Sequence, residues 1–385
     1  MTPTRRSPGW SCAAALALLL GACALPGAHP PWPPVPAVIG HRGASALRPE
    51  HTLEAYLQAI EDGADVIEPD LVITRDGVLI ARHENALAVQ DGGGKVTEAT
   101  TDVAERPEFA ARKTTKFIDG KPVIGWFSED FTLAEIKTLR ARERIPRERP
   151  ANAAHDGRYA IPTLQEVIAL VQRESARRAR VIGIEPETKH PSYFRSIGLP
   201  LEPPLLDLLE RNGWNHRGAP VVIQSFEVGN LKDIATRSSV RLAQLIGGGA
   251  GRPYDAVLQG ARSTLDYAQM STPEGLREIA RYAWAVAPYK ERVIPLLRGA
   301  DGKPTALGAP TAFVRDAHAA GLSVQVWTLR PENAFLPRSL RSPPPQDAPT
   351  ARGDGLAEAR AYLDAGVDAL FCDDPAVCRA ALRAR

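Results

Sequence analysis

The chain has 385 residues, of which 24% are charged and 44% belong to the hydrophobic set. This is the composition of a globular protein, and the length suffices for one large hydrophobic core or two small ones. The formal net charge is only +2 and no basic cluster alternates with aromatic residues, so nothing indicates nucleic-acid binding. We predict no protein partner either.

The N-terminus has the pattern of a targeting segment. Two arginines precede an apolar run over residues 12–20, which is too short to span a bilayer. The LGAC sequence that follows resembles a bacterial lipobox, in which the cysteine, here Cys23, becomes the lipidated first residue. We therefore predict a lipoprotein signal peptide over residues 1–22 and a lipidated cysteine with a proline-rich tether over residues 23–36. The alternative is an ordinary secretory signal with an incidental cysteine.

Either alternative places the mature chain outside the cytoplasm. We expect an exported lipoprotein of the bacterial periplasm or cell envelope, held on a membrane by its N-terminal lipid. Two further cysteines, Cys372 and Cys378, lie in this disulfide-permissive context. They form either a disulfide or two reduced, buried thiols, because sequence spacing alone does not fix the geometry.

Short apolar runs separated by helical patterns follow the tether, which is typical of alternating strands and helices and hence of a parallel sheet. About eight such units favour a TIM-type (β/α)8 barrel over residues 37–385. The first helix should begin after Thr52, a good N-cap residue, and end near Gly63. The strand candidates number nine, one more than a barrel needs: Ala37–Gly40, Val66–Ile73, Val78–Arg82, Val181–Ile184, Val221–Gln224, Leu242–Ile246, Trp284–Ala287, Ser323–Trp327 and Asp368–Cys372.

Residues from about 86 to 160 interrupt this alternation. They are polar and charged, with little strand pattern, and they include one expected amphipathic helix over Thr132–Arg142. We predict that this segment is an insertion on the rim of the barrel. A second interruption, residues 329–355, is proline-rich and is predicted to be a surface loop.

Two carboxylates lie two positions apart in one strand candidate. Side chains at Glu68 and Asp70 share a face of the strand, and paired buried carboxylates repel each other unless a cation lies between them. The alternative is an edge strand with solvated carboxylates. The apolar neighbours on both faces favour the buried arrangement.

A hairpin is expected directly after this strand. If Asp76 and Gly77 form a two-residue turn, His83 lies opposite Asp70 on the same face. The same hairpin accounts for the ninth strand candidate, since Val78–Arg82 would then return beside its neighbour.

A third carboxylate, Glu187, follows another strand candidate at the end where barrel sites assemble. Three carboxylates suit one hard divalent cation, and we favour Ca²⁺ over Mg²⁺. Lys189 would place a positive charge near an anion, or would pair with Glu185 as a rim lysine.

The segments HRGASALRPEHT and GADVIEPDLVITRDGVLIARHE closely resemble the opening motif of the glycerophosphodiester phosphodiesterases, TIM-barrel enzymes related to the catalytic barrel of phospholipases C. The similarity continues through IGIEPETKHP, VVIQSF, RLAQLI, VQVWTLR and GVDALFCDDP, from Val38 to Pro375. The first block and the insertion after it are most similar to the secreted, periplasmic branch.

The resemblance implies a role for each matching residue. Two positions depart from the family pattern: His51 stands where asparagine is usual, and Glu84 stands where aspartate is usual. Glu185 is a further carboxylate without an assigned role. The implied roles are catalysis for His41 and His83, metal binding for Glu68, Asp70 and Glu187, phosphate binding for Arg42 and Lys189, the glycerol-side pocket for Phe226 and Trp327, and the metal and substrate end of the site for Glu50.

The resemblance also implies metal-dependent hydrolysis of glycerophosphodiesters to an alcohol and sn-glycerol 3-phosphate. The glycerol 2-hydroxyl would attack phosphorus, and the two histidines would exchange protons on the way through a cyclic phosphate. Two alternatives remain open at this point. One is a related phosphodiesterase acting on a lysophospholipid or a cell-wall polymer, and the other is a non-catalytic surface-binding lipoprotein.

Overall fold

The strands predicted from the sequence lie side by side in one parallel sheet that closes on itself. The computed structural model describes residues 1–4 and 32–384, and eight strand positions form the ring within this part of the chain. Two positions are each split into two short strands, one at Pro69 and one at Glu185-Pro186. The closed ring confirms the TIM-type (β/α)8 barrel. Its strands are, in order, β1 (Ala37–His41), β2 and β3 (Val66–Glu68 and Asp70–Ile73), β9 and β10 (Gly183–Ile184 and Glu187–Thr188), β11 (Val222–Ser225), β12 (Arg241–Ile246), β13 (Ala285–Pro288), β16 (Ser323–Leu329) and β17 (Ala369–Cys372).

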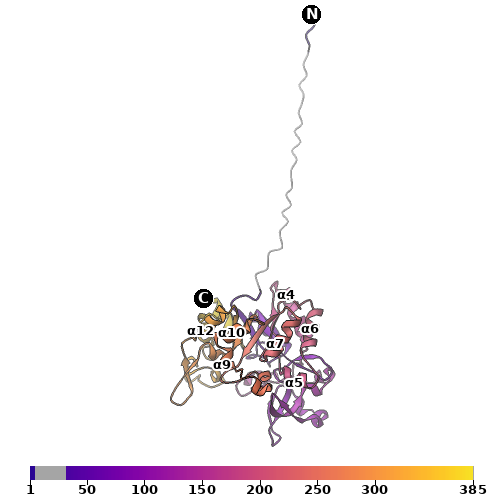
Figure 1. Ribbon diagram of the computed structural model, residues 1–385, viewed down its shortest axis with the longest axis vertical. Coiled ribbons are helices and arrows are strands. Elements are labelled where there is room, and N and C mark those ends of the chain that lie inside the picture. The colour runs from indigo at the N-terminus through magenta and orange to yellow at the C-terminus, as the bar shows by residue number, and fades with distance from the viewer. Residues whose placement is uncertain (5–31, 385) are drawn as a thin grey trace. The chain divides into compact units, whose positions relative to one another are not determined.

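Helices surround the ring, as the labelled α4, α6, α7, α10 and α12 show (Figure 1). The first helix begins after Thr52 as predicted, because the Thr52 hydroxyl accepts a hydrogen bond from the Ala55 N–H at 3.1 Å. Gly63 follows its C-terminus with a φ of +97°. The main outer helices are α1 (Leu53–Glu61), α4 (Leu164–Arg178), α6 (Glu202–Arg211), α7 (Val228–Arg237), α10 (Pro273–Ile279), α11 (Phe313–Ala319), α12 (Gly355–Asp364) and α13 (Pro375–Arg383).

The ninth strand candidate returns antiparallel to β3 as predicted, but its register differs by one residue. β4 (Leu79–Ala81) pairs Ala81 with Leu71, so Arg82, and not His83, lies opposite Asp70. The cause is the turn. Thr74 and Val78 close a three-residue loop in which Gly77 takes a φ of +81°, instead of the two-residue turn expected from Asp-Gly.

The prediction that the insertion has little strand structure is wrong. In the described chain it holds a four-stranded antiparallel sheet ordered β6-β5-β8-β7. The expected helix over Thr132–Arg142 is reduced to α2 (Leu133–Ile136), because the Ala141 N–H donates to the Tyr159 carbonyl instead of continuing the helix. The strands of the sheet are β5 (Ala86–Gln90), β6 (Val96–Ala99), β7 (Thr114–Ile118) and β8 (Lys121–Phe127).

The second interruption lacks long secondary structure. Residues 329–355 hold only two 3₁₀ turns and an isolated bridge between Glu332 and Arg352. Elsewhere on the barrel, short elements occupy the loops, and they are α3 (Pro150–Ala153), α5 (Pro191–Ser196), α8 (Tyr254–Leu258), α9 (Tyr267–Met270), β14 (Leu296–Arg298) and β15 (Pro304–Leu307).

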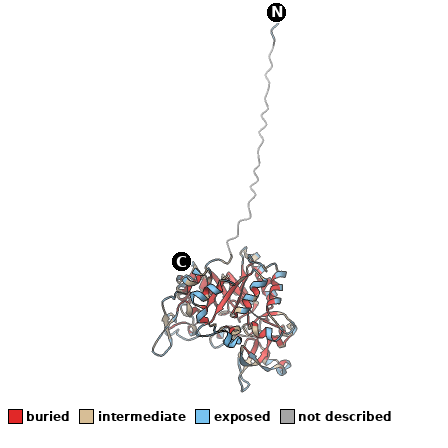
Figure 2. Ribbon diagram, viewed as in Figure 1, coloured by how far each residue is buried: buried red, intermediate tan, exposed pale blue. Residues whose placement is uncertain are grey.

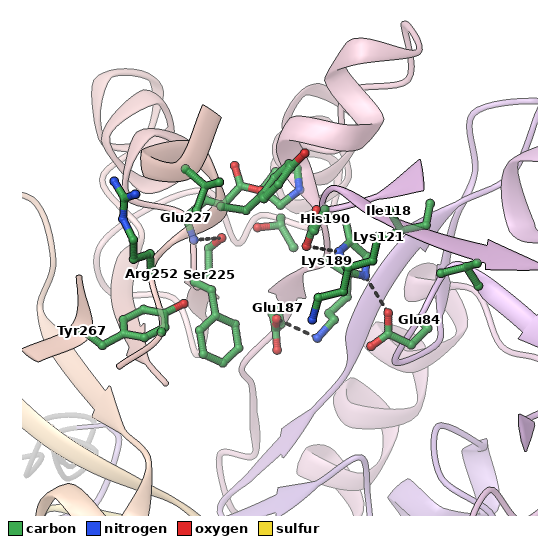
Figure 3. A pocket seen from close by; sticks show the side chains of 18 residues that line it. Glu84, Ile118, Lys121, Glu187, Lys189, His190, Ser225, Glu227, Arg252 and Tyr267 are labelled. Atoms are coloured by element: carbon green, nitrogen blue, oxygen red, sulfur yellow. Dashed lines mark hydrogen bonds and ion pairs between the residues drawn. The ribbon is translucent and has the colours of Figure 1, made fainter. Parts of the chain in front are cut away.

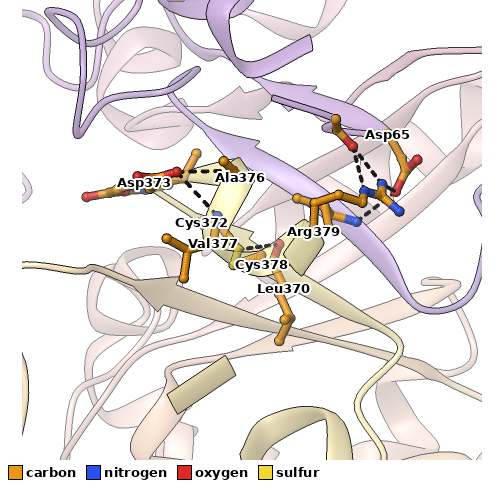
Figure 4. The surroundings of a disulfide bond; sticks show 12 residues. Asp65, Leu370, Cys372, Asp373, Ala376, Val377, Cys378 and Arg379 are labelled. Carbon is orange, nitrogen blue, oxygen red and sulfur yellow. Dashed lines mark hydrogen bonds and ion pairs between the residues drawn. A yellow bond between two sulfur atoms is a disulfide. The ribbon is translucent and has the colours of Figure 1, made fainter. Parts of the chain in front are cut away.

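Buried residues concentrate on the barrel strands and on the inner faces of the helices (Figure 2). Of the two alternatives for the C-terminal cysteines, the structure has the disulfide. Cys372 at the end of β17 bonds Cys378 in α13, and both are fully buried (Figure 4). This link ties the last barrel strand to the last helix, next to the site described below.

The N-terminal predictions fall largely outside the described residues. The signal segment over residues 1–22 and the lipidation site Cys23 have no described structure beyond residue 4. The predicted tether needs one correction, because Trp32 packs with the apolar residues inside the barrel. Among the described helices, none has the length and apolarity needed to cross a membrane.

Candidate active site

Parallel pairing brings the predicted site residues to one end of the barrel. His41 ends β1 directly beside Glu68, the last residue of β2. On the next pair, Glu187 lies beside Asp70, and its other neighbour is Gln224 of β11. Side chains far apart in the sequence therefore meet because they share a level of the sheet, at the end of the barrel where active sites assemble.

The three predicted metal carboxylates form one buried cluster. Glu68, Asp70 and Glu187 each offer an oxygen, and these oxygens lie within 4.8 Å of one another. Burial, together with the neighbouring Asp70, raises the pKa of Glu68 well above its usual value and that of Glu187 to about 8. Asp70 Oδ1 is buried without a hydrogen-bond partner. Oxygen donors that repel one another and one unpartnered oxygen fit a hard divalent cation.

Arg42 joins this cluster to Glu50. Its backbone N–H donates to Glu68 Oε2 at 2.8 Å, and its guanidinium lies 3.3 Å from Asp70 Oδ2 and 3.0 Å from Glu50 Oε2. Glu50 also accepts from Arg144 of the insertion at 3.0 Å. Glu50, predicted at the metal and substrate end, thus holds Arg42 in place and is not a member of the carboxylate cluster.

His41 is oriented by a residue that the sequence did not single out. Its Nδ1 lies 2.6 Å from Asp373 Oδ1, since β1 and β17 are parallel neighbours and both residues follow their strands' last paired positions. The other Asp373 oxygen accepts from Arg149, which also bonds Glu332 at 2.7 Å. Burial, followed by the charge of Arg42, lowers the pKa of His41. The bond to Asp373 therefore fixes the ring and leaves its Nε2 free. Because its pKa is lowered, the ring is neutral at physiological pH.

His83 reaches the same cavity despite the shifted register. Its Nδ1 lies 3.1 Å from Glu84 Oε1, and its side chain is 25% exposed. Desolvation, Arg42 and Lys189 lower the pKa of His83 well below its usual value. The prediction that His83 faces Asp70 directly is wrong, but the prediction that it belongs to the site agrees with its position.

Lys189 pairs with Glu187, at 3.0 Å, and not with the alternative Glu185 (Figure 3). Glu185 is fully buried inside the barrel, where Gln325 is its side-chain partner. The cavity between the site residues has a volume of about 160 Å³. It is lined by His41, Arg42, Glu68, His83, Glu187, Lys189, Gln224, Phe226, Leu245, Trp327 and Phe371.

Aromatic side chains close the far side of this cavity. The rings of Phe226 and Trp327 meet edge to face, with centroids 5.7 Å apart. The indole N–H of Trp327 donates to the Ala287 carbonyl at 2.9 Å, which fixes the ring. Both residues line the cavity, and their role in binding glycerol stays a prediction.

His51, one of the two departures from the family pattern, contacts a carboxylate of the buried cluster. Its Nε2 lies 2.9 Å from Asp70 Oδ2 and its Nδ1 lies 2.8 Å from the Tyr56 hydroxyl. Burial lowers the pKa of His51 to about 4, so the imidazole is neutral. A neutral ring has one N–H, and since Asp70 accepts, that proton is on Nε2 while Tyr56 donates to Nδ1.

Four residues of the site were not predicted from the sequence, and only some of them carry a sequence signal. Asp373 carried a signal, because it directly follows a strand candidate at the end where barrel sites assemble. Gln224 ends a strand candidate too and donates to Glu68 Oε1 at 3.0 Å. Arg144 and Arg149 lie in the insertion, where nothing local distinguishes them from its other arginines.

The structure is a (β/α)8 barrel that gathers two histidines, two cationic side chains (Arg42 and Lys189) and a carboxylate cluster at one end. These are the features of a metal-assisted hydrolase of anionic esters. A model of the glycerophosphoryl diester phosphodiesterase family matches residues 41–377. The chain belongs to that family.

Individual relatives agree with this assignment. The chain is 31% identical over 353 residues to the glycerophosphodiester phosphodiesterase GDPD6 of Arabidopsis thaliana, covering 88% of this chain and 83% of the relative. It is 28% identical over 269 residues to a glycerophosphodiester phosphodiesterase of Haemophilus influenzae, covering 65% and 68%.

Two solved structures show the same fold. A Silicibacter pomeroyi protein aligns with a TM-score of 0.60 at 22% identity, covering 92% of this chain and 95% of that protein. An Oleispira antarctica phosphodiesterase, solved in complex with the product sn-glycerol 3-phosphate, aligns with a TM-score of 0.54 at 18% identity, covering 91% and 97%.

Proposed function

We propose that the protein hydrolyses glycerophosphodiesters to an alcohol and sn-glycerol 3-phosphate. The observation that carries the proposal is the convergence of two histidines, two cationic side chains and the carboxylate cluster on one small cavity. A phosphodiester anion repels nucleophiles. The cationic side chains can neutralise its charge, and the histidines can transfer protons. Family membership and the product bound to the Oleispira antarctica relative support the choice of substrate.

The carboxylate cluster is the proposed site of one divalent cation. Held by Glu68, Asp70 and Glu187, such an ion would stabilise the negative charge that develops on the phosphoryl oxygens. We propose Ca²⁺ in preference to Mg²⁺, because calcium accepts several carboxylates in flexible geometry whereas magnesium retains a strict octahedron and several waters.

The chain's own residues then perform the proton transfers. Arg42 and Lys189 bind phosphoryl oxygens and orient phosphorus toward the glycerol 2-hydroxyl. His41 takes the proton of that hydroxyl as it attacks. Burial and the charges of Arg42 and Lys189 lower the pKa of His83, and the bound diester anion offsets those charges. His83, beside Glu84, then carries a proton as the imidazolium and gives it to the oxygen of the departing alcohol. Water then opens the cyclic phosphate with the two roles exchanged.

The positions of the two rings support this division of roles. His41 lies beside Phe371, with ring centroids 6.4 Å apart, on the aromatic side proposed for glycerol. His83 pairs with Glu84, which lines the larger adjoining pocket where the other ester arm would leave the cavity. With an activated leaving group, His83→Ala should be rescued more than His41→Ala. Equal rescue of the two variants would contradict the assignment.

The proposed activity is tested by measuring sn-glycerol 3-phosphate released from glycerophosphocholine. His41→Ala and His83→Ala should each lose roughly 10²–10⁴-fold in turnover. His216→Ala is a matched control, because His216 is an exposed histidine outside the site. Absence of product with the wild-type protein, or full activity in both site variants, would contradict the proposal.

We further propose that the chain is exported and anchored to the bacterial envelope through lipid on Cys23. The support is the sequence alone: a charged start, a short apolar run and a lipobox-like LGAC. Labelled fatty acid should be incorporated into the wild-type protein and not into Cys23→Ser. Incorporation into both, or into neither, would contradict the proposal.

A further inference from the structure

A second chamber adjoins the cavity of the candidate site, and Figure 3 shows the side chains that line the chamber. Its volume is about 580 Å³, several times that of the cavity, and the two share Glu187, Lys189 and Phe226 as lining residues. A phosphodiester has two arms. If glycerol phosphate fills the small cavity, the other arm extends past the shared residues into this chamber.

One wall of the chamber comes from the insertion. The turn between β7 and β8 carries Asp119, which His190 holds at 2.7 Å through Nδ1, while His190 Nε2 lies 2.6 Å from Glu84. These two carboxylates raise the pKa of His190 to about 9 against the lowering effect of burial. The imidazolium and its two carboxylates therefore fix the turn beside the catalytic residues His83 and Lys189.

The opposite wall comes from the loops after β11 and β12 and is partly aromatic. The ring of Tyr267 packs against Phe226, with centroids 6.2 Å apart. Tyr254 lies close to Gly120 of the insertion. A Cβ atom built on Gly120 would be 3.7 Å from the Tyr254 hydroxyl. The two walls thus approach each other at Gly120 and Tyr254.

Several polar groups in the chamber have no partner within the described chain. These are the hydroxyls of Tyr254 and Tyr267 and the ammonium group of Lys121. Asp119 Oδ1 is buried and also without a hydrogen bond. Two hydroxyls, one cationic donor and one acceptor oxygen, set around aromatic faces, are groups that bind several hydroxyls of one ligand.

The charges in the chamber disfavour a cationic ligand. Glu84 and Asp119 are neutralised in part by His190, and Glu227 is bonded to Ser192, with its pKa raised to about 7 by burial. Lys121 lines the chamber without an ion-pair partner in the described chain, and Arg252, which also lines it, donates to backbone carbonyls. A quaternary ammonium group would lie near these cations, whereas an uncharged ligand would not be repelled.

We propose that this chamber binds the leaving alcohol and favours an uncharged polyhydroxy alcohol over a cationic one. The inference rests on the proposed function, since it places the second arm of the same diester. It assigns specificity to Tyr254, Tyr267 and Lys121, with Asp119 as the acceptor that the insertion supplies.

The test compares kcat/KM for two substrates that share the glycerol phosphate arm. One releases glycerol and the other releases choline. The double variant Tyr254→Phe/Tyr267→Phe should lose roughly tenfold or more on the glycerol-releasing diester and much less on glycerophosphocholine. Tyr159→Phe, which removes a phenol hydroxyl that bonds only His155, should leave the ratio of the two values unchanged.

A charge reversal makes the test independent of folding defects. Lys121 is exposed, so Lys121→Glu should fold normally and should raise kcat/KM for glycerophosphocholine relative to the glycerol-releasing diester. Equal changes on both substrates in these variants, or no change, would overturn the inference while leaving the proposed function standing. Failure of the wild-type protein to cleave either substrate would overturn both.

Discussion

Nδ1 of His41, the last residue of β1, lies 2.6 Å from Oδ1 of Asp373, which directly follows the parallel neighbour β17. The other oxygen of Asp373, Oδ2, accepts from Arg149 of the insertion, and Nε of Arg330 lies 3.2 Å from this Oδ2. Burial opposes ionisation of Asp373, but Arg149 and His41 hold its pKa well below the usual value. The histidine proposed to accept the substrate proton is therefore fixed in orientation and tautomer by a permanently charged carboxylate.

Replacing Asp373 with asparagine should remove the charge that fixes the orientation and tautomer of His41, and it changes the size of the side chain little. We expect Asp373→Asn to lower kcat roughly 10²–10⁴-fold while KM changes little, because substrate binding does not involve Asp373. Steady-state kinetics with glycerophosphocholine measure both values. Asp91→Asn is the control, since Asp91 caps an exposed turn of the insertion. A raised KM with unchanged kcat would show that Asp373 does not act through His41.

His51 should act on metal affinity and not on proton transfer. Its Nε2–H donates to Asp70, so His51→Ala leaves a buried carboxylate of the proposed metal site without that support. Such losses typically weaken metal binding about 10–100-fold. Calorimetric titration with Ca²⁺ measures the change. His51→Asn restores the residue of the family pattern and a side-chain donor, and it should recover part of the affinity. Unchanged Ca²⁺ affinity in His51→Ala would refute this role.

The ion pairs of His190 with Asp119 and Glu84, here called the His190 clamp, should make the stability of the fold depend on pH. The folded pKa of His190 is raised to about 9, so its contribution is fully present below the unfolded value of 6.5 and is lost as pH rises through 9. The contribution is at most about 3 kcal/mol. Denaturant unfolding at pH 6.5 and pH 9.5 should show a decrease for the wild type that is largely absent in His190→Gln.

The control for this measurement is His216→Gln, which alters an exposed histidine away from the insertion. It should keep the full pH dependence of the wild type. An equal decrease in His190→Gln would mean that groups other than the clamp cause the pH dependence.

Strand positions were predictable because each barrel strand is a short apolar run that must be buried on both faces. The carboxylate cluster followed from the same logic, since Glu68, Asp70 and Glu187 interrupt buried strands where a charge needs a partner. The family resemblance supplied the remaining roles, including those of His41 and Arg42, which no spacing argument assigned.

The errors arose where tertiary contacts override local pattern. The turn at Gly77 has one more residue than Asp-Gly predicts, and this moved His83 by one position. The insertion strands escaped notice because β6 and β7 are partly exposed and carry polar residues without a buried face. The contacts of Arg144 and Arg149 join segments distant in sequence, so no local pattern could reveal them.

The central claim is that the carboxylate cluster holds a divalent cation on which phosphodiester hydrolysis depends. The most direct measurement is release of sn-glycerol 3-phosphate from glycerophosphocholine before and after excess EDTA, followed by added Ca²⁺ or Mg²⁺. Activity should be lost with EDTA and restored best by Ca²⁺, and Glu187→Gln should require more Ca²⁺ for half-maximal activity. Full activity in excess EDTA would contradict the account.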